Sequence, residues 1–164
     1  MTFQYKHIQS PLGLILIAAH EEGLTGLWFD KQKHHPNIAV WHKVKSQRWI
    51  DECEIEMKAY FDGVLREFTT PLSVTCGTAF QKSVWQVLKQ IPLGETISYG
   101  AVAQRLNKPQ AVRAVGAAVG KNPWSIIVPC HRVVGANASL TGYAGGLERK
   151  KSLLLLEKSY LCNL

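Results

Sequence analysis

The chain has 164 residues, of which 46% are hydrophobic and 19% charged, a balance that is typical of a folded globular protein and excludes a disordered chain. A chain of this length buries roughly two-thirds of its unfolded surface, so we expect it to fold without disulfide or metal cross-links. The formal net charge of +7 favours a polyanionic partner, of which nucleic acid is the commonest.

No segment of the sequence predicts a membrane span. The longest apolar run, residues 12–19, is far shorter than a bilayer-spanning helix, and the first residues lack the apolar core of an export signal. We therefore expect a cytoplasmic protein with no membrane partner. The cysteines are scattered without a zinc-ligand spacing, which predicts free thiols and no bound metal at Cys53, Cys76, Cys130 and Cys162.

The first part of the chain, residues 1–75, predicts an α/β domain. Residues 14–19 and 24–29 are apolar runs separated by a Glu-Glu-Gly turn, which is typical of a β-hairpin. Residues 49–61 carry apolar side chains at helical spacing and predict a helix. Residues 65–74 look extended and lead to the joint with the second part.

The second part, residues 76–164, predicts a mostly helical domain. A Thr-Ala-Phe-Gln capping box at 78–81 begins an amphipathic helix, and Ser98 is placed to cap a second one. A third helix is expected over 110–120 after a tight break, so the second and third helices together indicate a helix-turn-helix. A leucine-rich helix over 147–160 completes this part.

The expected outer face of the third helix combines tiny side chains with two cations, and it comprises Arg113, Ala114, Ala117, Gly120 and Lys121. Small side chains allow the backbone to approach a narrow DNA groove closely, with Arg113 as the one long probe. The alternative is that this face packs against another element and uses its small residues as spacers. Because an arginine is costly in a dry packing face, we favour contact with DNA.

An apolar, strand-like run over residues 125–128 leads through Pro129 to Cys130, His131 and Arg132. Two adjacent cations would lower the pKa of the thiol and make Cys130 a nucleophile, whereas most lone cysteines are inert small hydrophobes. A histidine that is next in sequence cannot readily point at the sulfur, so contact through a water molecule is the expected geometry.

Glu157 lies on the leucine-rich helix and is the candidate partner of His131, because a carboxylate drawn into the interior needs hydrogen-bond donors. The alternative is a surface ion pair between this carboxylate and one of the lysines nearby in sequence, which are Lys150, Lys151 and Lys158. Position in the sequence leaves both interpretations open.

Around the cysteine, the sequence resembles the methylated-DNA–protein-cysteine methyltransferases. The resemblance is carried by Pro129-Cys130-His131-Arg132-Val133, with Asn122-Pro123 before it and Tyr143-Ala144-Gly145-Gly146-Leu147 after it. It extends through Gly94-Glu95, Ser98-Tyr99-Gly100 and Arg113-Ala114-Val115-Gly116, and so covers residues 78–158 strongly. The first part of the chain matches mainly at Ser10-Pro11-Leu12-Gly13.

The resemblance implies an α+β fold. A small N-terminal α/β domain, with a mixed sheet and a helix in a ribonuclease H-like arrangement, would pack on a mostly helical C-terminal domain whose helix-turn-helix is winged-helix-like. The resemblance also implies a monomer that needs no cofactor, and it leaves cooperative binding along DNA open, while the compact chain without a zinc site favours a bacterial source. Some relatives hold a structural zinc ion in the first domain, but the matching positions here, such as His20 and Thr25, do not form that ligand set.

The implied activity is DNA repair by direct reversal of damage. The protein would flip O6-methylguanine, and to a lesser extent O4-methylthymine, out of double-stranded DNA. It would then transfer the alkyl group irreversibly and stoichiometrically to Cys130. The thioether product has no hydrolysable bond, so each molecule would act once.

The resemblance further implies roles for individual residues. In the catalytic set, Cys130 would be the acceptor thiol, His131 a base acting through water, and Glu157 the carboxylate that polarises this base. Tyr99 would donate a hydrogen bond to the leaving guanine, and Asn122 would brace the turn before the cysteine. Arg113 would fill the space left by the flipped base. The surface in contact with DNA would comprise Arg113, Ala114, Ala117, Gly120, Lys121 and Arg132.

The implied substrate pocket would be formed by Trp124, Ser125, Val133, Tyr143, Ala144, Gly145 and Gly146. In this pocket the backbone amide of Ala144 would face the lesion oxygen, and the backbone carbonyls of Cys130 and Val133 would accept from the guanine amino group. Ala144 stands where some relatives carry serine, so one side-chain hydrogen bond to the lesion would be absent. The preferred size of the adduct therefore stays open.

Three other functions compete with alkyl transfer. A non-enzymatic binder could flag alkylated DNA for another repair pathway, but such relatives replace the cysteine, and Cys130 is intact. A cysteine hydrolase would need a cysteine and a histidine facing each other across a site with an oxyanion hole. A transcription regulator would need long side chains on its recognition helix to read base edges, which this sequence lacks.

Overall fold

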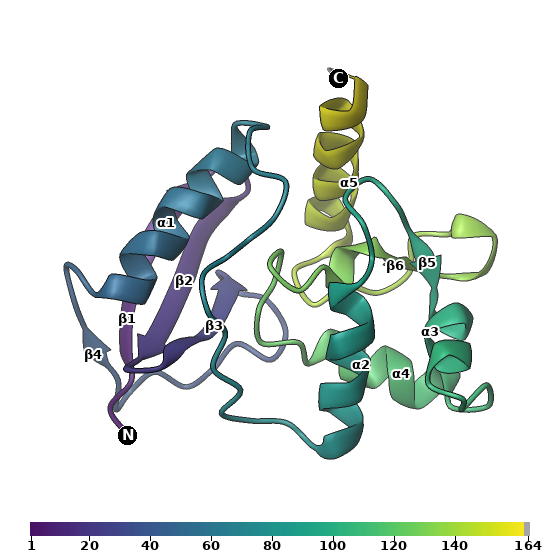
Figure 1. The fold of residues 1–164 in the computed structure, drawn as a ribbon, viewed down its shortest axis with the longest axis horizontal. Coiled ribbons are helices and arrows are strands. Elements are labelled where there is room, and N and C mark those ends of the chain that lie inside the picture. Colours follow the sequence, from purple (N-terminus) through teal and green to yellow (C-terminus); the bar gives the residue numbers. More distant parts are fainter. Residues whose placement is uncertain (163–164) are drawn as a thin grey trace.

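The computed structural model describes residues 1–162, which form an α+β fold with the sheet and the helices in separate parts. The four-stranded sheet and helix α1 (Arg48–Phe61) lie on one side of the molecule, and the remaining helices lie on the other (Figure 1). In the part of the chain that is described, no helix combines the length and apolarity needed to cross a bilayer. The expected α+β architecture is confirmed.

The sheet has the strand order β3-β2-β1-β4, and its strands are β1 (Gln4–Ser10), β2 (Gly13–His20), β3 (Gly23–Phe29) and β4 (His42–Lys43). The first three strands are antiparallel neighbours, and β4 pairs with β1 in parallel. The predicted hairpin is therefore confirmed as β2 and β3. The sequence pattern missed β1 and β4, which are half-buried or exposed and lack a continuous apolar run.

Helix α1 covers one face of this sheet, and the helix expected over 49–61 is confirmed. Its buried side chains recur at helical spacing and are Ile50, Cys53, Met57 and Tyr60. A second, smaller cluster covers the opposite face, where Trp28 packs with Trp41 from the segment before β4. Burial of both faces explains why β2 and β3 consist almost wholly of apolar residues.

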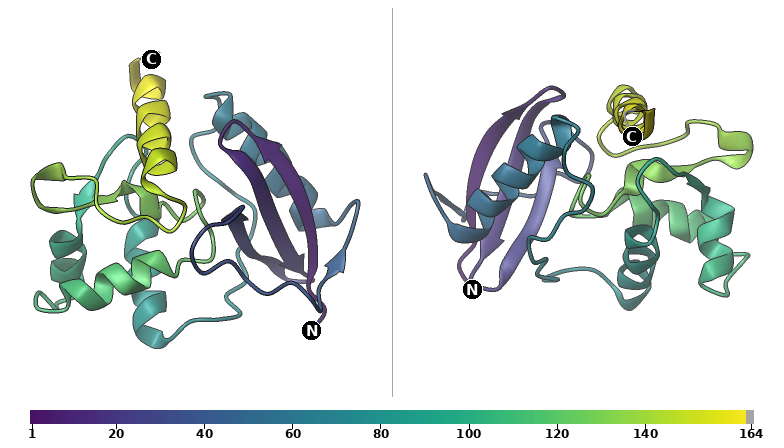
Figure 2. Two further views of the ribbon diagram at one scale, coloured as in Figure 1. Left: turned by 180° about the vertical axis from the view of Figure 1, so that it is seen from behind. Right: turned by 45° about the horizontal axis from the view of Figure 1, so that its top comes forward.

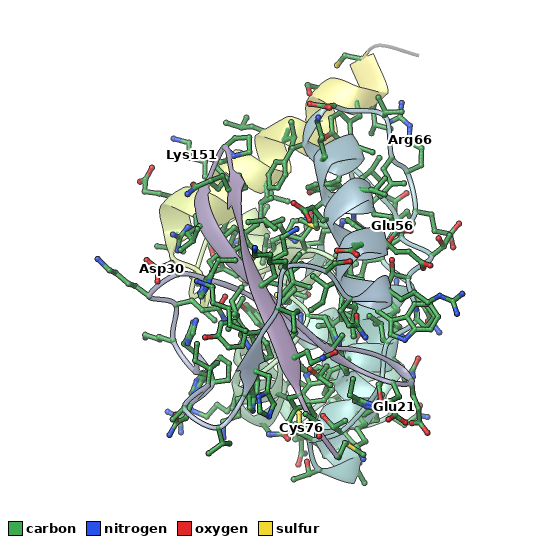
Figure 3. The ribbon with its side chains drawn as sticks, turned by 90° about the vertical axis from the view of Figure 1, so that its left-hand side faces the viewer. Glu21, Asp30, Glu56, Arg66, Cys76 and Lys151 are labelled. Atoms are coloured by element: carbon green, nitrogen blue, oxygen red, sulfur yellow. The ribbon has the colours of Figure 1, made fainter. Side chains whose placement is uncertain are left out.

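The segment expected to be extended, residues 65–74, forms no strand beyond a single bridge between Leu72 and Leu24. It is held instead by Glu56, which is labelled on α1 in Figure 3. The Glu56 carboxylate accepts hydrogen bonds from the backbone and hydroxyl groups of Thr69 and Thr70, at 2.7–3.2 Å. These side-chain contacts, and the backbone hydrogen bonds on either side of Leu72, hold the segment without a regular strand.

The second part contains the helices α2 (Ala79–Lys89), α3 (Tyr99–Arg105), α4 (Val112–Gly120) and α5 (Leu147–Cys162). Two 3-10 turns, η1 (Cys130–Arg132) and η2 (Ala136–Ala138), and a parallel strand pair, β5 (Ile97–Ser98) with β6 (Val133–Val134), connect them. The capping box at Thr78 and the cap at Ser98 are confirmed. Helices α3 and α4 pack on each other as a helix-turn-helix, with α4 starting two residues later than expected.

The two parts are joined along β3. The backbone of Leu27 donates to Pro123 at 2.8 Å and accepts from Ser125 at 3.0 Å, so this stretch runs beside the strand. The Trp124 indole donates to the Leu24 carbonyl at 3.0 Å and meets the Trp85 ring edge-on at 5.8 Å. Figure 2 shows the two parts of the molecule from behind and with the top tilted forward.

These contacts correct the placement of two residues expected in the substrate pocket. Trp124 and Ser125 are both only 2% exposed, because their side chains pack between the two parts of the molecule. The Ser125 hydroxyl donates to the amide oxygen of Gln32 at 3.3 Å. Trp124 and Ser125 are therefore joint residues and do not form the edge of a pocket.

We predict that Trp124→Ala lowers the free energy of unfolding by about 3–5 kcal/mol, because it removes a fully buried indole and leaves a cavity at the joint. Trp49 offers a matched control, since its indole lies partly exposed at the start of α1 and donates to Glu21. Urea denaturation of both variants measures the difference. Equal losses for Trp124→Ala and Trp49→Ala would show that the joint contributes nothing special to stability.

Candidate active site

Cys130 begins the 3-10 turn η1 and is 3% exposed. The residues before it do not form the expected strand. They make tight turns instead, in which Ile126 has a left-handed φ of 72° and the Cys130 amide donates to Val128 at 2.7 Å. The turns reverse the chain before η1, where the Cys130 side chain lies buried.

Asn122 holds these turns in place from the end of α4. Its side-chain amide donates to the carbonyls of Val128 at 2.8 Å and Trp124 at 3.2 Å, and its oxygen accepts from the Trp124 amide at 3.0 Å. It also lies close enough to Cys130 to lower the pKa of the thiol. Asn122 thus links α4, the second helix of the helix-turn-helix and here called the recognition helix, to the cysteine turn, which is the location expected for the brace.

Glu157 is fully buried on α5 and accepts hydrogen bonds from three side chains. The donors are the Tyr60 hydroxyl at 2.8 Å, His131 Nε2 at 2.6 Å, and Arg132 through Nε at 2.9 Å and Nη2 at 2.8 Å. The structure therefore pairs Glu157 with His131 and not with a surface lysine.

The charge state of this cluster follows from its contacts. Burial by itself raises the pKa of Glu157, but His131 and then Arg132 outweigh it and hold the pKa at about 2. Burial lowers the pKa of His131 more than Glu157 raises it, so the imidazole is neutral at pH 7. Its Nδ1 has no hydrogen-bond partner among residues 1–162 and can accept a proton.

Arg132 does not lie on the expected DNA-binding surface. Its side chain is turned inward, where Nη1 donates to the Ile91 carbonyl at 2.6 Å and the other nitrogens donate to Glu157. A buried carboxylate requires such a partner, since an unpaired buried charge costs several kcal/mol. The prediction that Arg132 contacts DNA was therefore wrong.

The thiol environment also differs from the expected one. Burial raises the pKa of Cys130, and neither His131 nor Arg132 provides the opposing charge. The neighbours that lower the pKa of the thiol are Asn122, then the charge of Lys150, and then Tyr143. The resting thiol is therefore protonated, and its activation must occur during the reaction.

Lys150 was missed by sequence reasoning because it lies within an Arg-Lys-Lys run that looks like a solvated surface. Its side chain is buried on the inner face of α5, and its ammonium group donates to the carbonyls of Thr141 and Gly142, both at 3.1 Å. Burial lowers its pKa to about 8. The available signal was helical spacing, because Lys150 precedes Leu153 by three residues and Glu157 by seven.

A cavity of about 170 Å³ opens between the helix-turn-helix, the loop before α5 and the segment after β3. Its lining residues are Lys33, His34, Tyr99, Gly116, Val119, Gly120, Gly142, Tyr143 and Ala144. Tyr99 and Tyr143 also lie close enough to Cys130 for the sulfur to raise the pKa of each hydroxyl, in addition to the effect of burial. The thiol therefore neighbours two walls of this cavity.

Of the remaining residues expected in the pocket, three do not line the cavity. Val133 is fully buried in the core. Gly145 lies behind the Tyr143 side chain, and a Cβ added at Gly145 would come within 2.8 Å of the Tyr143 ring. Gly146, with a left-handed φ of 91°, precedes α5. The two glycines shape the backbone that presents Tyr143.

The outer face of α4 is exposed at Arg113, Ala114, Ala117 and Lys121. Gly120 lines the cavity, so this small-residue face continues directly into the pocket. Within residues 1–162 no element packs over the exposed part, which disfavours the packing alternative. The same described residues contain no group of three metal-ligating His, Cys, Asp or Glu side chains.

Comparison with known proteins gives the same family for both parts of the chain. Residues 79–159 match the DNA binding domain of 6-O-methylguanine DNA methyltransferase, and residues 3–74 match its ribonuclease-like domain. The chain is similar to a methylated-DNA–protein-cysteine methyltransferase of Methanosarcina acetivorans, with 48% identity over 156 residues that cover 94% of this chain and 98% of the relative.

A second relative of the same name, from Haemophilus influenzae, is 44% identical over 154 residues that cover 94% of this chain and 86% of the relative. Among solved structures, the fold is similar to that of Mycobacterium tuberculosis OGT in complex with DNA. The TM-score is 0.89 at 44% identity, and the match covers 96% of this chain and 94% of that one.

We predict that Glu157 contributes to loss of stability in acid. Its pKa falls from 4.5 to about 2 on folding, so its stabilising effect is complete above pH 4.5 and is lost as the pH falls to about 2. In Glu157→Gln, the free energy of unfolding should change less steeply across that window, by up to about 1.4 kcal/mol per pH unit. Urea denaturation at intervals of pH measures the slope.

Glu148→Gln is the matched control, because Glu148 lies exposed on the same helix. Its slope should follow that of the unaltered protein. If Glu157→Gln has the unaltered slope as well, the carboxylate is not held ionised by its neighbours.

Proposed function

The chain belongs to the family of 6-O-methylguanine DNA methyltransferases, the methylated-DNA–protein-cysteine methyltransferases, and on this premise we propose that it repairs O6-methylguanine in double-stranded DNA. The methyl group passes to Cys130 of the same molecule, which then has no further activity. The observation that carries the proposal is the position of the buried thiol beside Tyr99 and Tyr143, the two aromatic walls of a cavity under the recognition helix.

The transfer is a displacement at the methyl carbon. A bond forms between the Cys130 sulfur and this carbon, and the bond between the carbon and the guanine oxygen breaks. The thiol proton passes to Nδ1 of His131 through a water molecule, and the resulting imidazolium is stabilised by Glu157, to which Nε2 already donates at 2.6 Å. The neutral resting state of His131 supports its role as the base.

Tyr99 offsets the charge that develops on the leaving guanine. Burial raises the pKa of its hydroxyl, so the group stays protonated and available as a donor to the guanine ring nitrogen. In the free protein this hydroxyl makes only long hydrogen bonds, at 3.2 Å to Thr141 and 3.4 Å to Gly142. The length of these contacts supports the proposed role, because the hydroxyl can give them up to donate to the lesion.

The lesion reaches the cavity by base flipping. Ala114, Ala117 and Gly120 allow α4 to approach the minor groove closely, Lys121 contacts phosphate, and Arg113 fills the space in the duplex. O4-methylthymine has an equivalent methyl–oxygen bond and is proposed as a second, poorer substrate. Since one molecule holds the thiol, the base and the pocket, a monomer suffices for the reaction.

Two further expectations stay predictions. The boundary between the domains at residues 75 and 76 is one of them. The other is a bacterial source with a cytoplasmic location. Relatives at similar identity come from both a bacterium and an archaeon, so they do not decide the source.

We predict that incubation with a duplex containing O6-methylguanine adds a single methyl group to the protein, located on Cys130. Intact-mass measurement followed by peptide mapping detects it. Cys130→Ser should gain no mass, whereas Cys76→Ser, which removes an exposed thiol, should react as the unaltered protein does. Tight binding to the damaged duplex without any mass gain would instead support the non-enzymatic binder.

We predict that Arg113→Ala slows methyl transfer from duplex DNA far more than transfer from the free base O6-methylguanine. Loss of the side chain that occupies the flipped base's place costs a few kcal/mol only when a base must be extruded, which corresponds to on the order of 100-fold in rate. Single-turnover rates on both substrates measure the effect. Equal slowing on the two would remove Arg113 from the flipping step.

A further inference from the structure

One wall of the cavity comes from the N-terminal part of the molecule. Lys33 and His34, here called the N-terminal wall, lie in the segment between β3 and β4, whereas all other lining residues fall between Tyr99 and Ala144. In the view from behind in Figure 2, the chain leaves β3 and bulges toward the helical part before it returns to β4. The cavity is therefore complete only where the two parts of the molecule meet.

Gln32 fixes the N-terminal wall from within. It is only 7% exposed, and its side-chain oxygen accepts from the Phe29 amide at 2.7 Å and from the Ser125 hydroxyl at 3.3 Å. Its side-chain nitrogen donates to the Lys33 carbonyl at 3.3 Å. A buried amide with this many partners holds the segment in one position.

The N-terminal wall is also hydrogen-bonded directly to the loop before α5, which carries Ala144. The Lys33 amide donates to the Ala144 carbonyl at 2.9 Å. Arg149 makes a second connection, because its Nη1 donates to the carbonyls of Asp30 and Gly145, both at 3.2 Å, while its guanidinium covers the Phe29 ring at 4.8 Å. Asp30, labelled in Figure 3, marks the start of the segment.

His34 has a left-handed backbone, with a φ of 59°, which is uncommon for residues other than glycine, although histidine adopts it more often than most. This conformation turns the chain at the rim of the cavity. Of the other lining residues, Tyr99, Val119 and Tyr143 are large, whereas four carry little or no side-chain bulk, namely Gly116, Gly120, Gly142 and Ala144. Steric selection in this cavity is therefore shared between those three larger side chains and the N-terminal wall.

We propose that Lys33 and His34 limit the size of the alkyl group that the pocket accepts, with Gln32 and Arg149 as positioning residues. This inference rests on the proposed function, in which the Ala144 amide faces the lesion oxygen. Because the Lys33 amide donates a hydrogen bond to the Ala144 carbonyl, the N-terminal wall lies on the side of the pocket where the alkyl group is attached. A bulky substituent there meets the wall, and a methyl group does not.

The test compares two duplexes of one sequence, containing O6-methylguanine or O6-benzylguanine, in single-turnover transfer to Cys130. His34→Gly removes the imidazole and suits the left-handed backbone. The ratio of the benzyl rate to the methyl rate should rise about 10-fold or more, the range in which one steric contact discriminates substrates. His35→Ala is the matched control, because His35 does not line the cavity, and it should leave the ratio unchanged.

Gln32→Ala tests the positioning role and should raise the same ratio, which a general loss of stability would not do. If the ratio of the benzyl rate to the methyl rate is unchanged in His34→Gly while methyl transfer is intact, the size-limiting role of the N-terminal wall is overturned and the proposed function is not. A parallel fall of both rates, together with weaker binding to undamaged duplex, would overturn that size-limiting role in favour of a phosphate contact. Absence of methyl transfer by the unaltered protein would instead overturn the proposed function, and this inference with it.

Discussion

The rest of the structure depends on the hydrogen bonds that the buried Glu157 carboxylate accepts. It accepts from Tyr60 on α1, from His131 and from Arg132, and so joins the N-terminal helix, the cysteine turn and α5 at one point. Removing any donor would leave an underpaired charge in the interior, which is strongly destabilising. The packing of the two parts and the orientation of the His131 imidazole are therefore set by the same contacts.

This arrangement separates groups that are adjacent in the Cys130-His131-Arg132 sequence. Arg132 neutralises Glu157, His131 is neutral, and the cation near the Cys130 thiol is Lys150 on a different element. Burial keeps the thiol protonated, so the free protein does not present a reactive thiolate. A protein proposed to use its nucleophile once gains from such latency, because adventitious alkylation or oxidation would consume it.

Features with local causes could be predicted from the sequence. The capping box at Thr78, the cap at Ser98 and the β2–β3 hairpin each depend on residues a few positions apart. Features set by distant contacts could not. Arg132 looked like a DNA contact because its partner lies 25 residues away, and Trp124 looked like a pocket residue because its partner, Leu24, lies 100 residues away.

The same distinction explains why the cavity was only half predicted. Its helical walls belong to a continuous motif, so Tyr99, Tyr143 and Ala144 could be assigned by resemblance. Lys33 and His34 reach it through contacts that span more than 90 residues, between Lys33 and Ala144 and between Gln32 and Ser125. In our proposal, the helical part supplies the chemistry and the sheet part supplies the limit on adduct size. Changes in the segment after β3 could then alter substrate range without touching the reacting groups.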